Sequence, residues 1–160
     1  MKKADLYRIK AGLEEFGEVK GGAFAYKSIK NLELVTKEVE VLNKLREPTE
    51  TYIKNIQTPL QELVRKYAEV DENDNVIEEI TPEGTKIKVD ASKQEEFLAE
   101  RDVLLEKESK LVKAYDKQME GFEKVIEEDT DIEFIMYVEA DIPDNVSVKD
   151  LYQIRELLKD

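Results

Sequence analysis

The chain of 160 residues contains no cysteine, no histidine and no tryptophan. Without cysteine it has neither a thiol nucleophile nor a disulfide, which fits a reducing compartment such as the cytoplasm. Histidine is the commonest general acid and base, so its absence restricts any catalysis to carboxylates, lysine, tyrosine, serine and threonine. We therefore expect a non-enzymatic protein without a cofactor or a metal. A small enzyme that uses carboxylates is the catalytic alternative.

Long apolar runs are absent as well. The first apolar residues, Leu6, Ile9 and Leu13, are spaced rather than consecutive, which speaks against a signal peptide or a membrane span. We expect a protein of the cytoplasm, or of the host cytoplasm if the chain is viral. A chain of this length suits a single domain with its own core.

The formal net charge of −13 is unevenly distributed. Residues 1–46 carry ten Lys and Arg against seven Asp and Glu, whereas residues 47–160 carry 15 against 31. Nucleic-acid affinity comes mainly from cations that neutralise phosphates, so we expect no direct nucleic-acid binding. A protein partner with a basic surface is favoured instead. The alternative is that the acidic residues only keep the helices in solution.

Apolar residues at steps of three and four predict a short helix over about 3–16 and a longer one over about 23–46, with a turn at Gly21-Gly22 between them. Glu47-Pro48 disfavours a helix, because a residue before proline avoids the helical region.

The next apolar stripe, from Tyr52 to Tyr67, keeps its phase across Pro59. It predicts one kinked helix, with the Thr49 and Thr51 hydroxyls as candidate N-terminal caps.

Between 70 and 90 the apolar period changes to two around the turn-forming Pro82 and Gly84, which predicts a β-hairpin. Ser92 with Glu95 reads as a capping box and opens a helix that we expect to reach about 126. Apolar residues recur along this helix in two adjacent seven-residue columns, a band wide enough for two partner helices. One column supplies the candidate self-association residues of a homodimer: Leu98, Leu105, Val112 and Met119.

The last part of the chain again alternates, from Ile132 to Ala140, which predicts a strand with two largely apolar faces. Asp141 to Asp144 forms a turn, and Ser147 with Asp150 can cap a final short helix.

These segments give an α+β fold that is mainly α. Long antiparallel helices, similar to a coiled coil, hold an inserted β-hairpin, and a C-terminal strand and short helix follow. We expect one elongated domain with these segments: 1–22, N-terminal helix and glycine turn; 23–69, helices; 70–90, hairpin; 91–128, long helix; 129–160, strand, turn and helix.

Two stretches carry a resemblance to known proteins. Residues 6–31 read LYRIKAGLEEFGEVKGGAFAYKSIKN, acidic helices follow, and residues 140–158 read ADIPDNVSVKDLYQIRELL. This resembles small helical proteins encoded by tailed phages, which have no assigned activity. The order of long helix, hairpin and long helix also resembles prefoldin-type chaperone subunits in architecture. These resemblances imply an accessory, assembly or chaperone-like role.

Aromatic and basic residues cluster beside the diglycine, and this cluster is a candidate partner-binding site. Its candidate residues are Tyr26, Lys27, Lys30 and Asn31. Interleaved rings and cations can stack on and pair with a partner. The alternative is a helix whose aromatic residues enter the core while its lysines stay in solvent.

The segment from Asp71 to Asn75 resembles the first half of a calcium loop. The sixth position is Val76 instead of glycine, and the twelfth is Pro82 instead of glutamate. A polar turn that enters the hairpin is therefore the favoured interpretation.

Two functions from different classes remain alongside the enzyme. The first is a factor that works by binding another protein. The second is an acidic inhibitor that occupies a nucleic-acid-binding or defence protein of the host with carboxylates in place of phosphates. Mimicry of this kind needs acidic groups that are not paired with lysine, and residues 93–126 interleave the two signs.

Overall fold

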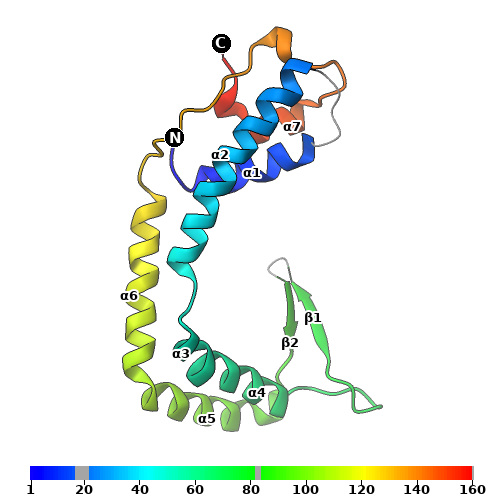
Figure 1. Ribbon diagram of the computed structural model, residues 1–160. Helices are drawn as coiled ribbons and strands as arrows, with labels where there is room; N and C mark the ends of the chain where they lie inside the picture. Colours follow the sequence, from blue (N-terminus) through cyan, green and yellow to red (C-terminus); the bar gives the residue numbers. More distant parts are fainter. Residues whose placement is uncertain (17–21, 82–83, 160) are drawn as a thin grey trace. The chain divides into compact units, whose positions relative to one another are not determined.

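The computed structural model describes residues 1–16, 22–81 and 84–159 (Figure 1). The chain divides into two compact units. Met1–Glu47 and Gln118–Asp160 form one, which we name the terminal unit, and Pro48–Lys117 form the other, the central unit. The predicted mainly helical α+β fold with an inserted hairpin is confirmed. The expectation of one elongated domain stays a prediction.

Helices dominate the terminal unit. They are α1 (Asp5–Glu15), α2 (Gly22–Arg46), the last half of α6 (Ser109–Ile126), α7 (Val148–Gln153) and two 3-10 turns, η4 (Glu139–Asp141) and η5 (Arg155–Leu157). Both helices predicted before residue 47 are therefore confirmed. The predicted glycine turn lies largely outside the described residues, and its Gly22 begins α2.

The core of the terminal unit is built from the apolar faces of α1, α2, α6 and the C-terminal turns. Its buried members are Leu6, Ile9, Leu13, Phe16, Phe24, Val35, Val39, Leu42, Phe122, Tyr137, Ile154 and Leu157. The rings of Phe16, Phe24 and Tyr137 pack in succession, with 5.0 Å between the centres of each neighbouring pair. The first stripe predicted from the sequence thus faces the core.

Helices α1 and α7 approach each other closely at Gly12. A Cβ atom built on Gly12 would lie 2.5 Å from Cβ of Gln153 and 3.3 Å from Cγ2 of Ile154. Real Cβ atoms do not come so near, so this contact requires glycine.

Residues 130–138 are extended but form no strand, so the predicted C-terminal strand is wrong. The described backbone has one isolated bridge here, between Tyr137 and Leu158. The side chain of Asn31, on α2, replaces the missing strand. Its Nδ2 donates to the Ile135 carbonyl oxygen at 2.9 Å, and its Oδ1 accepts from the Ile135 amide at 2.8 Å.

The last helix begins as predicted. Oγ of Ser147 accepts from the Asp150 amide, and the Asp150 carboxylate accepts from the Ser147 amide, both at 3.2 Å. This reciprocal pair satisfies two amides that a helix leaves free at its start.

In the central unit, α3 (Glu50–Tyr52), a π-helical turn η2 (Ile53–Gln57) and α4 (Thr58–Lys66) follow one another without a break. Thr49 caps this run, because its hydroxyl oxygen accepts from the Tyr52 amide at 3.2 Å. The π-helical turn ends two residues before Pro59, whose missing N–H disrupts the regular bonding.

The predicted hairpin is confirmed. Strands β1 (Glu78–Thr81) and β2 (Gly84–Ile87) pair antiparallel, with Ile80 opposite Thr85. Its base is bonded to the end of α4, since the Asp90 amide donates to the Tyr67 carbonyl oxygen at 2.9 Å. The hairpin is therefore anchored at its base.

After the hairpin, η3 (Ala91–Lys93) leads into α5 (Gln94–Lys107), which returns beside α4 (Figure 1). The predicted Ser92 capping box is wrong. Asp90 is the cap, and its Oδ1 accepts from the Ser92 amide at 2.9 Å and from the Ser92 hydroxyl at 2.7 Å.

The single long helix predicted to reach residue 126 is also wrong. Helix α5 ends at Lys107, and α6 begins at Ser109. Between them Glu108 has φ −98° and ψ 21°, outside the helical region. Its carbonyl oxygen accepts from the Leu111 and Val112 amides and starts a new helix. The two apolar columns therefore belong to two helices and form no continuous band.

Candidate functional site

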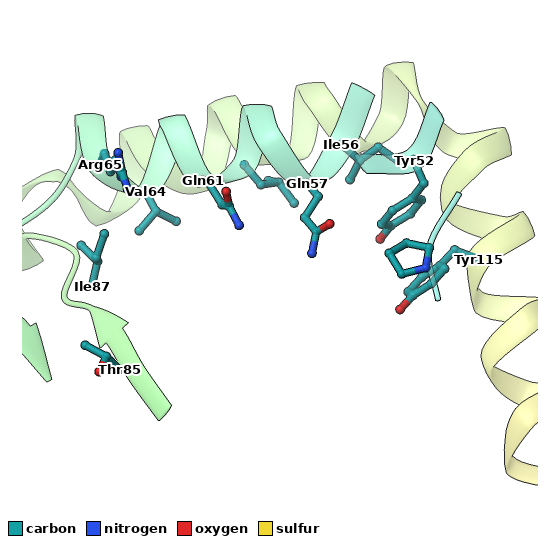
Figure 2. A pocket seen from close by; sticks show the side chains of 11 residues that line it. Tyr52, Ile56, Gln57, Gln61, Val64, Arg65, Thr85, Ile87 and Tyr115 are labelled. Carbon is teal, nitrogen blue, oxygen red and sulfur yellow. The ribbon is translucent and has the colours of Figure 1, made fainter. Parts of the chain in front are cut away.

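An open cavity of about 520 Å³ lies in the central unit, between the α3–α4 run and the hairpin (Figure 2). We name it the central groove. Its lining residues are Pro48, Tyr52, Ile56, Gln57, Leu60, Gln61, Val64, Arg65, Thr85, Ile87 and Tyr115.

The apolar side of the central groove is one stripe of the α3–α4 run. Tyr52, Ile56, Leu60 and Val64 follow at steps of four, and residues four apart lie one above the other on a helix. At 1.5 Å per residue, this stripe is about 18 Å long. The apolar residues whose spacing predicts the helix thus also line the groove.

An aromatic pair lies at one end of the central groove. The rings of Tyr52 and Tyr115 are tilted by 30° with 4.3 Å between their centres. Burial raises the pKa of Tyr52, and the nearby Tyr115 and Asp116 add to this effect. Tyr52 therefore stays neutral at physiological pH, and the two rings present flat, apolar faces.

The hairpin lies at the other end. Thr85 and Ile87 lie on one face of β2, because alternate residues of a strand share a face, and both side chains lie beside the groove in Figure 2. Ile80 is the pairing partner of Thr85 and is 89% exposed. This end of the groove therefore continues into exposed apolar surface.

A polar ridge runs beside the apolar stripe. Gln57, Gln61 and Arg65 are also four residues apart, and Figure 2 shows the two glutamine side chains directed into the open space. Arg65 is the one charged side chain among the residues that line the groove. The central unit as a whole has 11 Lys and Arg and 17 Asp and Glu, a net charge of −6. The groove is thus lined by a positive charge although the unit as a whole is negative.

Contacts between α4 and α5 fix the outer wall of the central unit. The Tyr67 hydroxyl donates to Oε1 of Glu100 at 2.8 Å, and Nζ of Lys66 donates to the same oxygen at 2.6 Å. The bonds from Lys66 and then from Tyr67 lower the pKa of Glu100. Tyr67 also packs edge-on against Phe97. These contacts therefore hold α4, which lines the groove, against α5.

The four residues predicted to bind a partner fall into two pairs with different surroundings. Tyr26 is 61% exposed, and Lys30 forms a surface ion pair with Glu33 at 2.9 Å. Lys27 and Asn31 instead hold the chain itself. Nζ of Lys27 pairs with Asp141 at 2.5 Å and donates to the Met136 carbonyl oxygen at 3.0 Å.

The four predicted self-association residues lie in different places. Leu98 and Leu105 are half-buried on α5, and Val112 is half-buried on α6. Met119 packs against the core of the terminal unit. Self-association through these residues stays a prediction, although the single helix that was expected to carry them does not form.

The segment from Asp71 to Asn75 forms the polar turn that the sequence favours. Oδ1 of Asp71 accepts from the Asn73 amide at 2.8 Å and from the Asn75 amide at 2.9 Å. These bonds, first that from Asn75, lower the pKa of Asp71. Throughout the described residues no three acidic side chains are placed to hold a metal ion.

Comparison with protein-family models, with curated proteins and with solved structures gives no match for this chain. The function must therefore be argued from the geometry. No helix within the described ranges has the length and apolar character needed to cross a membrane.

Sequence reasoning did not find the central groove. The stripe from Tyr52 to Val64 predicts a helix but no groove, because an apolar periodicity gives the face of a helix but not what covers it. The signal that was present is the parallel row of Gln57, Gln61 and Arg65. A polar row that directly adjoins an apolar stripe marks the edge of a surface rather than the middle of a core.

Proposed function

We propose that this chain acts by binding another protein, without catalysing a reaction, and that the central groove receives the partner. The observation that carries this proposal is the open, largely apolar cavity of about 520 Å³ beside an aromatic pair. Contiguous apolar surface that stays accessible on a protein is characteristic of interaction sites. The accessory, assembly or chaperone-like role implied by the resemblance to phage proteins would be exerted through this surface.

The shape of the groove favours a protein segment over a small molecule. A small-molecule site usually encloses 70–90% of its ligand's surface, whereas this groove is open along one side (Figure 2). An open groove about 18 Å long suits a chain segment that enters at one end and leaves at the other. The tyrosine pair adds large rigid side chains of the kind that dominate binding energy at interfaces.

Site-specific photocrosslinking tests the proposal. Benzoylphenylalanine is placed at Gln61, which lines the groove, or at Glu62, the adjacent exposed residue of α4 that does not line it. Both variants are irradiated in the cells that naturally produce the chain. We expect an adduct with another protein from position 61 and none from position 62.

Equal adducts from both positions, or none from position 61, would contradict a groove-specific partner. An adduct with a second copy of the chain would instead identify the groove as a self-association surface. Circular dichroism of both variants checks that the helices are retained.

A further inference from the structure

In the terminal unit, polar side chains of one helix hold an extended segment of the chain. Lys27 and Asn31 are one turn apart on α2. The Asn31 amide bonds both backbone groups of Ile135, and Lys27 donates to the next carbonyl oxygen, that of Met136. A polar row on a helix thus replaces a neighbouring strand.

The central groove presents a similar polar row with nothing bonded to it. Among the described residues, the side chains of Gln57, Gln61 and Arg65 have no hydrogen bond or ion pair with the rest of the chain. A carboxamide carries both a donor and an acceptor, so each glutamine can pair with the N–H and the C=O of one peptide residue. This is the pairing that Asn31 makes with Ile135.

The spacing of the row matches an extended backbone. Four residues of helix rise about 6 Å, and two residues of a strand rise about 6.4–6.8 Å. Gln57 and Gln61 can therefore reach residues i and i+2 of one extended segment, whose backbone groups point to the same side. The flexible glutamine side chains absorb the difference of less than 1 Å.

The residues around the polar row determine which side chains a bound segment would carry. Tyr52, Leu60 and Val64 lie beside the glutamines, are partly exposed and would receive apolar side chains. Ile56 of the same stripe is fully buried. Arg65 stands at the hairpin end of the row, and no acidic residue lines the groove to neutralise it. An Asp or Glu at that end of the segment would form a charge-assisted pair with its guanidinium group.

We propose that the central groove binds an extended peptide segment of a partner protein. Gln57 and Gln61 pair with the backbone of alternate residues, and Arg65 pairs with an acidic side chain. This inference rests on the proposed function, because it names the kind of segment that the same groove accepts.

The test is a selection of random ten-residue peptides, displayed on phage, on the immobilised full-length chain. Selected peptides are synthesised, and their affinities are measured by fluorescence anisotropy. We expect apolar residues at alternate positions and an acidic residue near one end. Methylation of single backbone nitrogens should weaken binding with a period of two residues.

Three variants separate the contributions. Gln57→Leu with Gln61→Leu removes both carboxamides at exposed positions, and we expect at least a tenfold loss of affinity. The matched control, Gln94→Leu, changes an exposed glutamine outside the groove and should have no effect. Arg65→Gln should abolish the preference for the acidic residue.

Leu60→Ser distinguishes the failure of this inference from the failure of the proposed function. Peptides that need Leu60 but bind the double glutamine variant as tightly as the wild type would overturn the extended-peptide inference and leave the groove as the binding surface. Apolar spacing of three and four in the peptides would likewise indicate a bound helix. Peptides insensitive to both Leu60 and the glutamines, or no enrichment at all, would overturn both proposals.

Discussion

The bond between Asn31 and Ile135 gives the sharpest test of the fold. Asn31 is fully buried, and its carboxamide makes two hydrogen bonds to the backbone of the extended segment. Asn31→Leu keeps nearly the same volume but removes both partners of the Ile135 amide and carbonyl. The backbone of Ile135 then has no partner, while the bonds to Met136 and Tyr137 remain.

The magnitude follows from these two bonds. Each contributes about 0.5–1.5 kcal/mol net, and a buried group left without a partner costs about 1–3 kcal/mol. Ile135 is half-buried, so water satisfies part of what is lost. We expect Asn31→Leu to lower the free energy of unfolding by about 2–3 kcal/mol.

Urea unfolding followed by circular dichroism measures this loss, and hydrogen exchange at the Ile135 amide locates it. Asn43→Leu is the matched control on the same helix, since Asn43 accepts one bond, from the Tyr7 hydroxyl at 3.2 Å in a partly buried site. Its loss should stay below about 1 kcal/mol.

A destabilisation by Asn31→Leu no larger than that of Asn43→Leu, together with unchanged exchange at Ile135, would refute the reasoning. It would show that the position of the extended segment does not depend on the Asn31 bonds. It would also remove the precedent on which the peptide-binding inference draws.

Three further predictions concern packing, pH and assembly. Gly12→Ala should destabilise by about 1–3 kcal/mol, because its methyl group would collide with Gln153; Gly121→Ala, which meets open space, should stabilise by up to about 1 kcal/mol in the same urea titration. The hydrogen bond from Lys27 lowers the pKa of Asp141, so the native state binds that proton more weakly than the unfolded chain does. Asp141→Asn should therefore lower the free energy of unfolding by a constant amount above about pH 4, and this loss should disappear as the pH falls through the lowered pKa of Asp141. A difference in unfolding free energy between wild type and variant that is as large at pH 2 as at pH 7 would contradict this. Light scattering at micromolar concentration tests the predicted homodimer, and the molar mass of a monomer would contradict it.

The sequence by itself determined the elements that depend on near neighbours in the chain. Helix periodicity placed α1 and α2, alternation placed the hairpin, and the Ser147 cap set the start of α7. Each of these signals is local, because a helix bonds residues four apart and a cap bonds residues three apart. The polar turn that begins at Asp71 is local for the same reason.

Only the tertiary structure decided what the apolar segments meet. Residues 130–138 have the alternation of a strand, yet a strand needs a neighbouring strand, and here an asparagine 104 residues away satisfies the backbone instead. The break at Glu108 has no glycine or proline to announce it. The stripe from Tyr52 to Val64 lines an open groove because the hairpin, anchored at Tyr67, stands beside it without filling it. Periodicity specifies which face of a helix is apolar, and only the packing of distant segments specifies whether that face is covered.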